Sequence, residues 1–135
     1  MAASPVHLQE DANRLSNVLA ALGIMRGDCV AVVMAERPEA LVCERACRQL
    51  GAVSVALLPA VADLDGLLQQ AAARVAIVDA AAWGALAPLR AGLPRLRHVI
   101  GIDGAAAGVR AWTSLLPLAS PHYDGVAAAE PARVE

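Results

Sequence analysis

The chain has 135 residues, enough for one domain with a sizeable hydrophobic core. Its net charge is −2, only 2% of it is aromatic and all 11 basic residues are arginine, so we do not expect nucleic acid as a partner and exclude sites that need a lysine of this chain. No apolar run approaches the roughly 18 residues of a membrane span, and the first residues lack the apolar core of a secretory signal, so we expect a cytoplasmic protein.

The first predicted element is an amphipathic helix. Ser4 suits its N-cap and Pro5 its first position, and Gly23 suits a left-handed end. A helix with one apolar face must lie against another element. The apolar residues that repeat at helical spacing are Leu8, Ala12, Leu15, Val18, Leu19 and Leu22.

Strands and helices then alternate. The run "CVAVVM" (29–34) is apolar at every position, which is typical of a parallel strand covered on both faces. Further strands are predicted at 53–58, 75–78 and 97–102. This alternation predicts an α/β fold, a three-layer domain with a mostly parallel sheet of about four to five strands flanked by helices.

Three further helices follow the first three strands. One opens at Pro38 and Glu39, which suit its first turn, and closes at Gly51. Two others are expected behind the caps Asp63 and Asp79, the second running to about residue 90.

The pattern weakens after the fourth strand. Residues 104–108 are expected to form a loop, and "AWTSLLPLA" (111–119) a short helix broken near its proline. From residue 120 the chain contains Pro, Gly and small residues without a period. We therefore divide it into an α/β unit over 1–119 and a linker or frayed tail over 120–135.

The bend at 34–38, "MAERP", is the first candidate for a ligand site. It follows a strand and precedes a helix, where an anion can dock on free N–H groups. It contains no glycine, however, and Glu36 and Arg37 can simply be solvated. Chain reversal is the favoured interpretation and ligand binding the alternative.

The other chemistry-bearing residues have structural explanations. Alternate residues of a tail cannot converge into a triad, a strand histidine is more often structural than a ligand, and a helical cysteine pair needs two more ligands to hold a metal. Buried thiols and packed tryptophans are ordinary core residues. We therefore predict no catalytic, cofactor-binding or metal-binding residue. The residues so interpreted are Cys29, Cys43, Cys47, Trp83, His98, Trp112, Ser120, His122 and Asp124.

Several segments in order resemble the acyl-CoA synthetases, the AMP-dependent synthetase and ligase family of adenylate-forming enzymes. "LQEDANRLSNVLAALGIMRGDCVAVVMAERPEALVCERACRQLGAVSVALLP" looks like the N-terminal part of their large domain. "ARVAIVDAA", "LPRLRHVIGIDG" and "GVRAWTSLLPLAS" resemble the units that follow, in the order of the acetyl- and medium-chain branch. Nearly the whole chain takes part. It departs from the family at residues 1–7, at Glu36 and at Ala56.

The resemblance implies ATP-dependent carboxylate–CoA ligation in an intact parent, with ATP, Mg²⁺ and CoA bound by parts outside this chain. The family's phosphate loop, rich in Ser, Thr and Gly and ending in Lys-Gly, would be expected just after "AAAEPARVE". In the family the "AERPEA" bend is a connection beside the nucleotide site and not the phosphate cradle.

Two hypotheses follow. The first is an N-terminal synthetase fragment, inactive alone, whose partner is the remainder of the large domain. The second is a standalone interaction module on the same scaffold, which self-associates or binds a partner through the face left uncovered. A receiver-like or dinucleotide-binding domain is disfavoured, because its acidic cluster and its glycine fingerprint are both missing.

Overall fold

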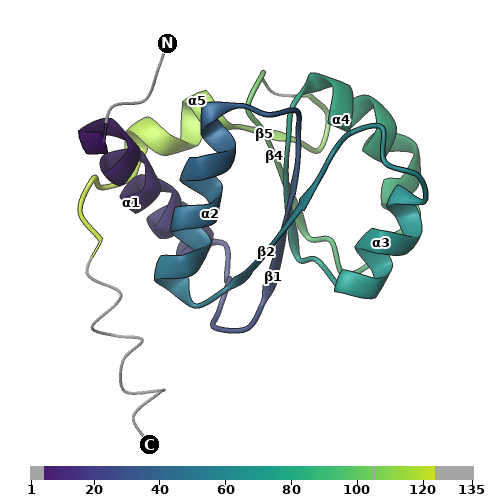
Figure 1. Ribbon diagram of the computed structural model, residues 1–135, viewed down its shortest axis with the longest axis horizontal. Helices are drawn as coiled ribbons and strands as arrows, with labels where there is room; N and C mark the ends of the chain where they lie inside the picture. The colour runs from purple at the N-terminus through teal and green to yellow at the C-terminus, as the bar shows by residue number, and fades with distance from the viewer. Residues whose placement is uncertain (1–4, 105, 124–135) are drawn as a thin grey trace, which may run out of the picture.

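The computed structural model describes residues 5–104 and 106–123 and shows an α/β fold built on one parallel sheet (Figure 1). The strands lie in the order β2-β1-β3-β4-β5, and every neighbouring pair is parallel. This confirms the predicted architecture. The strands are β1 (Cys29–Val33), β2 (Val53–Leu57), β3 (Val75–Val78), β4 (His98–Gly101) and β5 (Arg110–Ala111).

Helices cover both faces of the sheet. Figure 1 shows α1, α2 and α5 on one face and α3 and α4 on the other. Two short 3₁₀ segments, η1 and η2, continue α4 and α5. The bounds are α1 (Pro5–Ala21), α2 (Pro38–Leu50), α3 (Leu64–Ala71), α4 (Ala80–Leu86), η1 (Ala87–Gly92), α5 (Trp112–Leu115) and η2 (Leu116–Leu118).

Strand β1 has a helical layer on each side, which explains its unbroken apolar sequence. All five of its residues are buried. Successive side chains of a strand point to opposite faces. Val30 and Val32 accordingly join the core beneath α1 and α2, whereas Ala31 and Val33 join the core beneath α3 and α4.

The cysteines belong to the core, as predicted. All three are buried, free thiols. Burial raises the pKa of the Cys43 thiol well above its usual range, and burial together with Cys29 raises the pKa of Cys47 to about 12. These groups are protonated small hydrophobes at neutral pH.

The predicted helix ends are correct at several positions. Gly51 ends α2 with φ +75°, and Gly23 adopts φ +94° after α1. Asp63 and Asp79 cap α3 and α4 by accepting hydrogen bonds from the N–H groups of Gly66 and Ala82. The caps therefore set the helix starts as their side chains predicted.

Two elements differ from the prediction. The helix after β3 does not stay α-helical to residue 90, because α4 ends at Leu86 and the chain tightens into η1, where Pro88 lacks the N–H that an α-helix needs. The fifth strand, β5, is only two residues long, and the loop and helix predicted around it gave no sign of its position.

The segment after η2 is tied to α1 by side chains of the "ANRLSN" stretch. Arg14 Nη1 donates to the carbonyl oxygen of Ala119 at 2.6 Å and also reaches those of Leu116 and Pro117. Asn13 and Asn17 donate to the carbonyls of residues 120, 121 and 122. The described chain thus stays on α1 as far as residue 122, while the role of 120–135 as a linker stays a prediction.

Candidate functional site

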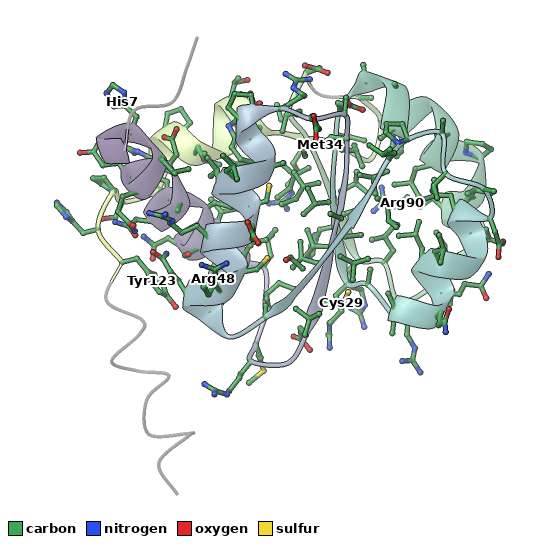
Figure 2. The ribbon with its side chains drawn as sticks, viewed as in Figure 1. His7, Cys29, Met34, Arg48, Arg90 and Tyr123 are labelled. Carbon is green, nitrogen blue, oxygen red and sulfur yellow. The ribbon has the colours of Figure 1, made fainter. Side chains whose placement is uncertain are left out.

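The first place to look for a ligand site in this fold is the carboxyl edge of the sheet, between β1 and β3. The connection after β1 leads to α2 on one face, and the connection after β3 leads to α4 on the other (Figure 1). Where neighbouring connections diverge in this way, open α/β sheets form a crevice that takes ligands. Figure 2 marks this edge at Met34, opposite the edge at Cys29.

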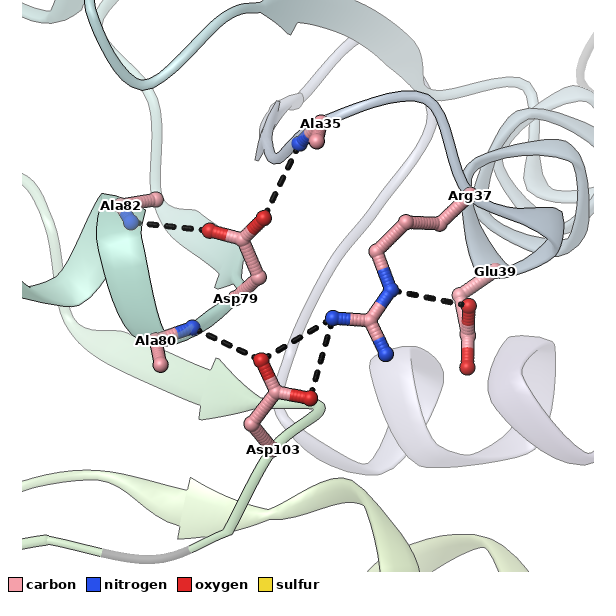
Figure 3. Close-up of polar contacts among 7 residues, drawn as sticks. All are labelled: Ala35, Arg37, Glu39, Asp79, Ala80, Ala82 and Asp103. Carbon is pink, nitrogen blue, oxygen red and sulfur yellow. Dashed lines mark hydrogen bonds and ion pairs between the residues drawn. The ribbon is translucent and has the colours of Figure 1, made fainter.

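Asp79 occupies this crevice with its own carboxylate (Figure 3). Its Oδ2 accepts a hydrogen bond from the Ala35 N–H at 3.0 Å, and its Oδ1 accepts one from the Ala82 N–H at 2.8 Å. The residue is only 6% exposed. The N–H groups that could hold an external anion are therefore bound by an internal one, and the carboxylate links the β1 bend to the start of α4.

Arg37 and Asp103 form a second link across the same edge. Arg37 Nη1 lies 3.0 Å from both carboxylate oxygens of Asp103, whose Oδ2 also accepts the Ala80 N–H at 2.9 Å (Figure 3). The Ala80 hydrogen bond and the guanidinium lower the pKa of Asp103, and the Asp103 hydrogen bond in turn raises the pKa of Arg37. Glu39 adds an ion pair with Arg37 Nε at 3.4 Å.

The space left beside these links is small. A pocket of about 150 Å³ lies between the ends of β3 and β4, lined among others by Trp83, Asp103 and Val109. That is well below the roughly 300 Å³ at which small-molecule sites begin. The acids on its wall already accept backbone and guanidinium hydrogens, so none is available as a free general base.

The bend at 34–38 therefore joins elements by its own contacts. Glu36 is exposed, as the interpretation of a solvated side chain allowed, whereas Arg37 is only partly exposed and forms an ion pair with Asp103. Sequence reasoning missed Asp103. A signal existed, because the acid in "GIDG" directly follows a strand that must end at the same edge as the bend.

The other candidates that the structure describes take no part in the links at this edge, although Trp83 lines the small pocket beside them. His98 opens β4 at the amino edge, and Trp83 and Trp112 pack against opposite cores. Ser120 Oγ accepts a hydrogen bond from the backbone N–H of His122, while Asp124 lies outside the described residues. The prediction of no catalytic residue among them stays a prediction.

A model of the family described as AMP-binding enzyme matches residues 6–128. The chain belongs to this family. No curated protein matches the sequence.

Solved structures named CoA synthetases and a CoA ligase share the fold. Acetoacetyl-CoA synthetase from Streptomyces lividans is 27% identical, with a TM-score of 0.77 over 87% of this chain and 21% of that one. A fatty acyl CoA synthetase from Mycobacterium tuberculosis is also 27% identical, with a TM-score of 0.76 over 88% and 23%. An anthranilate CoA ligase in complex with anthranoyl-AMP, at 23% identity, supports the fold alone, with a TM-score of 0.79 over 86% and 22%. The chain spans about a fifth of the length of each.

The acids at the carboxyl edge do not fit the Mg²⁺ that the family resemblance implies for an intact enzyme. Magnesium takes carboxylate oxygens that are free to coordinate it. Both oxygens of Asp79 accept N–H groups, and both oxygens of Asp103 face Arg37. Within the part of the chain that the structure describes, no three His, Cys, Asp or Glu side chains gather where they could hold a metal. Nor does any described helix have the length and apolar character needed to cross a membrane.

Proposed function

We propose that the chain forms the N-terminal part of the large domain of an ATP-dependent acyl-CoA synthetase. The intact enzyme would convert a carboxylate, ATP and CoA into acyl-CoA, AMP and pyrophosphate. The observation that carries the proposal is the family match over residues 6–128, together with structural neighbours at 27% identity that are named CoA synthetases.

We propose further that the 135 residues alone are inactive. Adenylation needs cations that hold the phosphates in line with the attacking carboxylate. This chain has no lysine, and its crevice at the carboxyl edge is closed by Asp79. Residues in the rest of the enzyme would bind ATP, Mg²⁺ and CoA.

Two experiments test these statements. The reading frame beyond the codon for Glu135 is expected to encode a loop rich in Ser, Thr and Gly that ends in Lys-Gly, and a frame without it contradicts the synthetase assignment. Carboxylate-dependent ATP–pyrophosphate exchange is expected from the intact enzyme and not from the purified 135 residues. Exchange by the purified chain would contradict only the proposed inactivity.

The acyl substrate and the location are proposals that rest on the resemblance. Acetate or a medium-chain carboxylate is the expected substrate, and the cytoplasm is the expected compartment. Exchange rates of the intact enzyme with acetate, octanoate and benzoate test the first, and fractionation of the source cells tests the second. Highest activity with benzoate would move the enzyme away from the acetyl and medium-chain branch.

The exposed outer edge of β2 indicates that another protein segment packs against this chain. Figure 1 shows β2 in front of β1, with α2 and α3 to either side and no described element in front of it. Val53 and Leu58 at this edge are 51% and 60% exposed, and Leu41 of α2 is 56% exposed. An open strand edge with apolar side chains is a template for association.

The remainder of the synthetase large domain is the partner we propose for this edge. A standalone module that self-associates through it is the second candidate function. Light scattering during size exclusion separates the two: a monomer at high concentration contradicts the self-associating module, whereas a defined dimer supports it.

A further inference from the structure

A groove of about 590 Å³ opens at the amino edge of the sheet, the edge opposite the one closed by Asp79. Figure 2 marks this edge at Cys29, which lines the groove. Its charged lining residues are Asp28, Arg74, Arg95 and Arg97. A chain with a net charge of −2 thus gathers three arginines and one acid around a single groove.

Two of these arginines are neighbours on adjacent strands. Arg74 directly precedes β3 and Arg97 directly precedes β4. In the pairing of these strands Val75 lies opposite His98, and the Arg97 N–H donates to the Arg74 carbonyl at 2.8 Å. Adjacent strands lie about 4.8 Å apart, and like charges side by side across strands repel.

Asp28, the one acid among the described residues that line the groove, compensates only part of this repulsion. Arg74 Nη1 lies 3.7 Å from Asp28 Oδ1, and the other oxygen of Asp28 accepts the Met25 N–H. Within the described residues, the side chains of Arg95 and Arg97 have neither an ion pair nor a hydrogen-bond acceptor. Asp28 is therefore neutralised by Arg74, and two positive charges remain for a ligand.

His98 follows Arg97 directly and is affected by its charge. Its pKa is lowered first by burial and then by Arg110, Arg90 and Arg97. Of these arginines, Arg97 lines the groove, and its effect on the neighbouring His98 agrees with a positive charge that no described acid compensates.

We propose that this groove binds a small phosphate-bearing anion, held by the side chains of Arg95 and Arg97. Guanidinium groups match phosphate oxygens in a forked geometry and stay charged at every physiological pH. The volume lies within the range of small-molecule sites. The inference does not rest on the proposed function, because it uses only the charges at the amino edge.

Amide chemical shifts of the ¹⁵N-labelled 135-residue chain, recorded while inorganic pyrophosphate is added at constant ionic strength, test the proposal. Saturable shifts are expected around residues 27–29, 71–74 and 94–98. The double variant Arg95→Gln/Arg97→Gln is expected to weaken binding about tenfold or more, as the loss of charge-assisted bonds predicts. The control Arg48→Gln, which removes one positive charge at a 73% exposed arginine of α2, is expected to leave the dissociation constant unchanged, whereas Arg95→Gln or Arg97→Gln alone, with the same change of charge, is expected to weaken binding.

Three results would overturn the inference. Shifts that rise linearly without saturation indicate non-specific screening, and equal weakening by the Arg48→Gln control indicates an effect of net charge. Tighter binding of a tetraglutamate peptide than of pyrophosphate assigns the groove to an acidic protein segment. Each result is independent of pyrophosphate exchange by an intact synthetase, so the two proposals fail separately.

Discussion

Replacing Asp79 by Asn tests whether the carboxylate really closes the crevice between β1 and β3. Asp79 is buried and each of its oxygens accepts one backbone N–H. Asparagine keeps one acceptor oxygen, but its NH₂ group would face a second N–H, so one buried donor loses its partner. A lost hydrogen bond to a charged group costs about 1.5 kcal/mol, at the low end of its usual range.

The expected shift in Tm follows from the size of the chain. An unfolding entropy of about 2.1 cal/mol/K per residue gives about 0.28 kcal/mol/K for 135 residues. A loss of about 1.5 kcal/mol therefore lowers Tm by about 5 °C, which thermal unfolding followed by circular dichroism resolves.

Asp63→Asn is the matched control, because it changes the net charge by the same amount at another helix cap. Asp63 is exposed, has φ +59° and accepts a single N–H at 3.2 Å. Asparagine caps helices as well as aspartate and tolerates this left-handed backbone, so Tm is expected to change by less than about 1 °C. Equal shifts in the two variants would refute the buried role given to Asp79.

Three further predictions concern other contacts. Because the pKa of Asp103 is lowered in the folded state, its ion pair stabilises the fold above about pH 4 and is lost as pH falls through the folded pKa, so the urea midpoint of Asp103→Asn should fall less steeply than that of the wild type between pH 5 and 2. Arg14→Ala removes the donor to three carbonyls and should speed chymotrypsin cleavage within residues 116–122 severalfold, whereas Arg48→Ala should not. With a pKa of about 12, the Cys47 thiol is ionised to only about one part in 10⁴ at pH 8, so Ellman's reagent should label the native chain slowly and the chain in urea at once. Unchanged pH slopes in Asp103→Asn, unchanged cleavage in Arg14→Ala, or fast native labelling would each contradict the corresponding contact.

The layered fold could be predicted because the buried faces of strands and helices show in the sequence as a regular spacing of apolar residues. A strand covered on both faces must be apolar at every position, and β1 and β3 are. Caps are similarly local, since Asp79 meets its partner three residues further on. In contrast, β5 pairs only two residues with β4, which is too few to create a pattern.

The contacts at the carboxyl edge were less accessible to sequence reasoning because they join residues far apart in the chain. Arg37 meets Asp103 across 66 positions, and Asp79 meets Ala35 across 44. In the second case one partner is a backbone N–H, which any residue type would supply. Residue identity therefore reveals the acceptor but not the group that it holds.

Hydrogen bonds between a side chain and a backbone group also account for polar residues of α1. Asn13, Arg14 and Asn17 donate to backbone carbonyls of the segment after η2, so they place few demands on the side chains of that segment. Substitutions in that segment are therefore expected to keep these hydrogen bonds, whereas loss of the α1 donors is expected to remove them. The helix therefore fixes the path of the described chain after η2 through its own side chains.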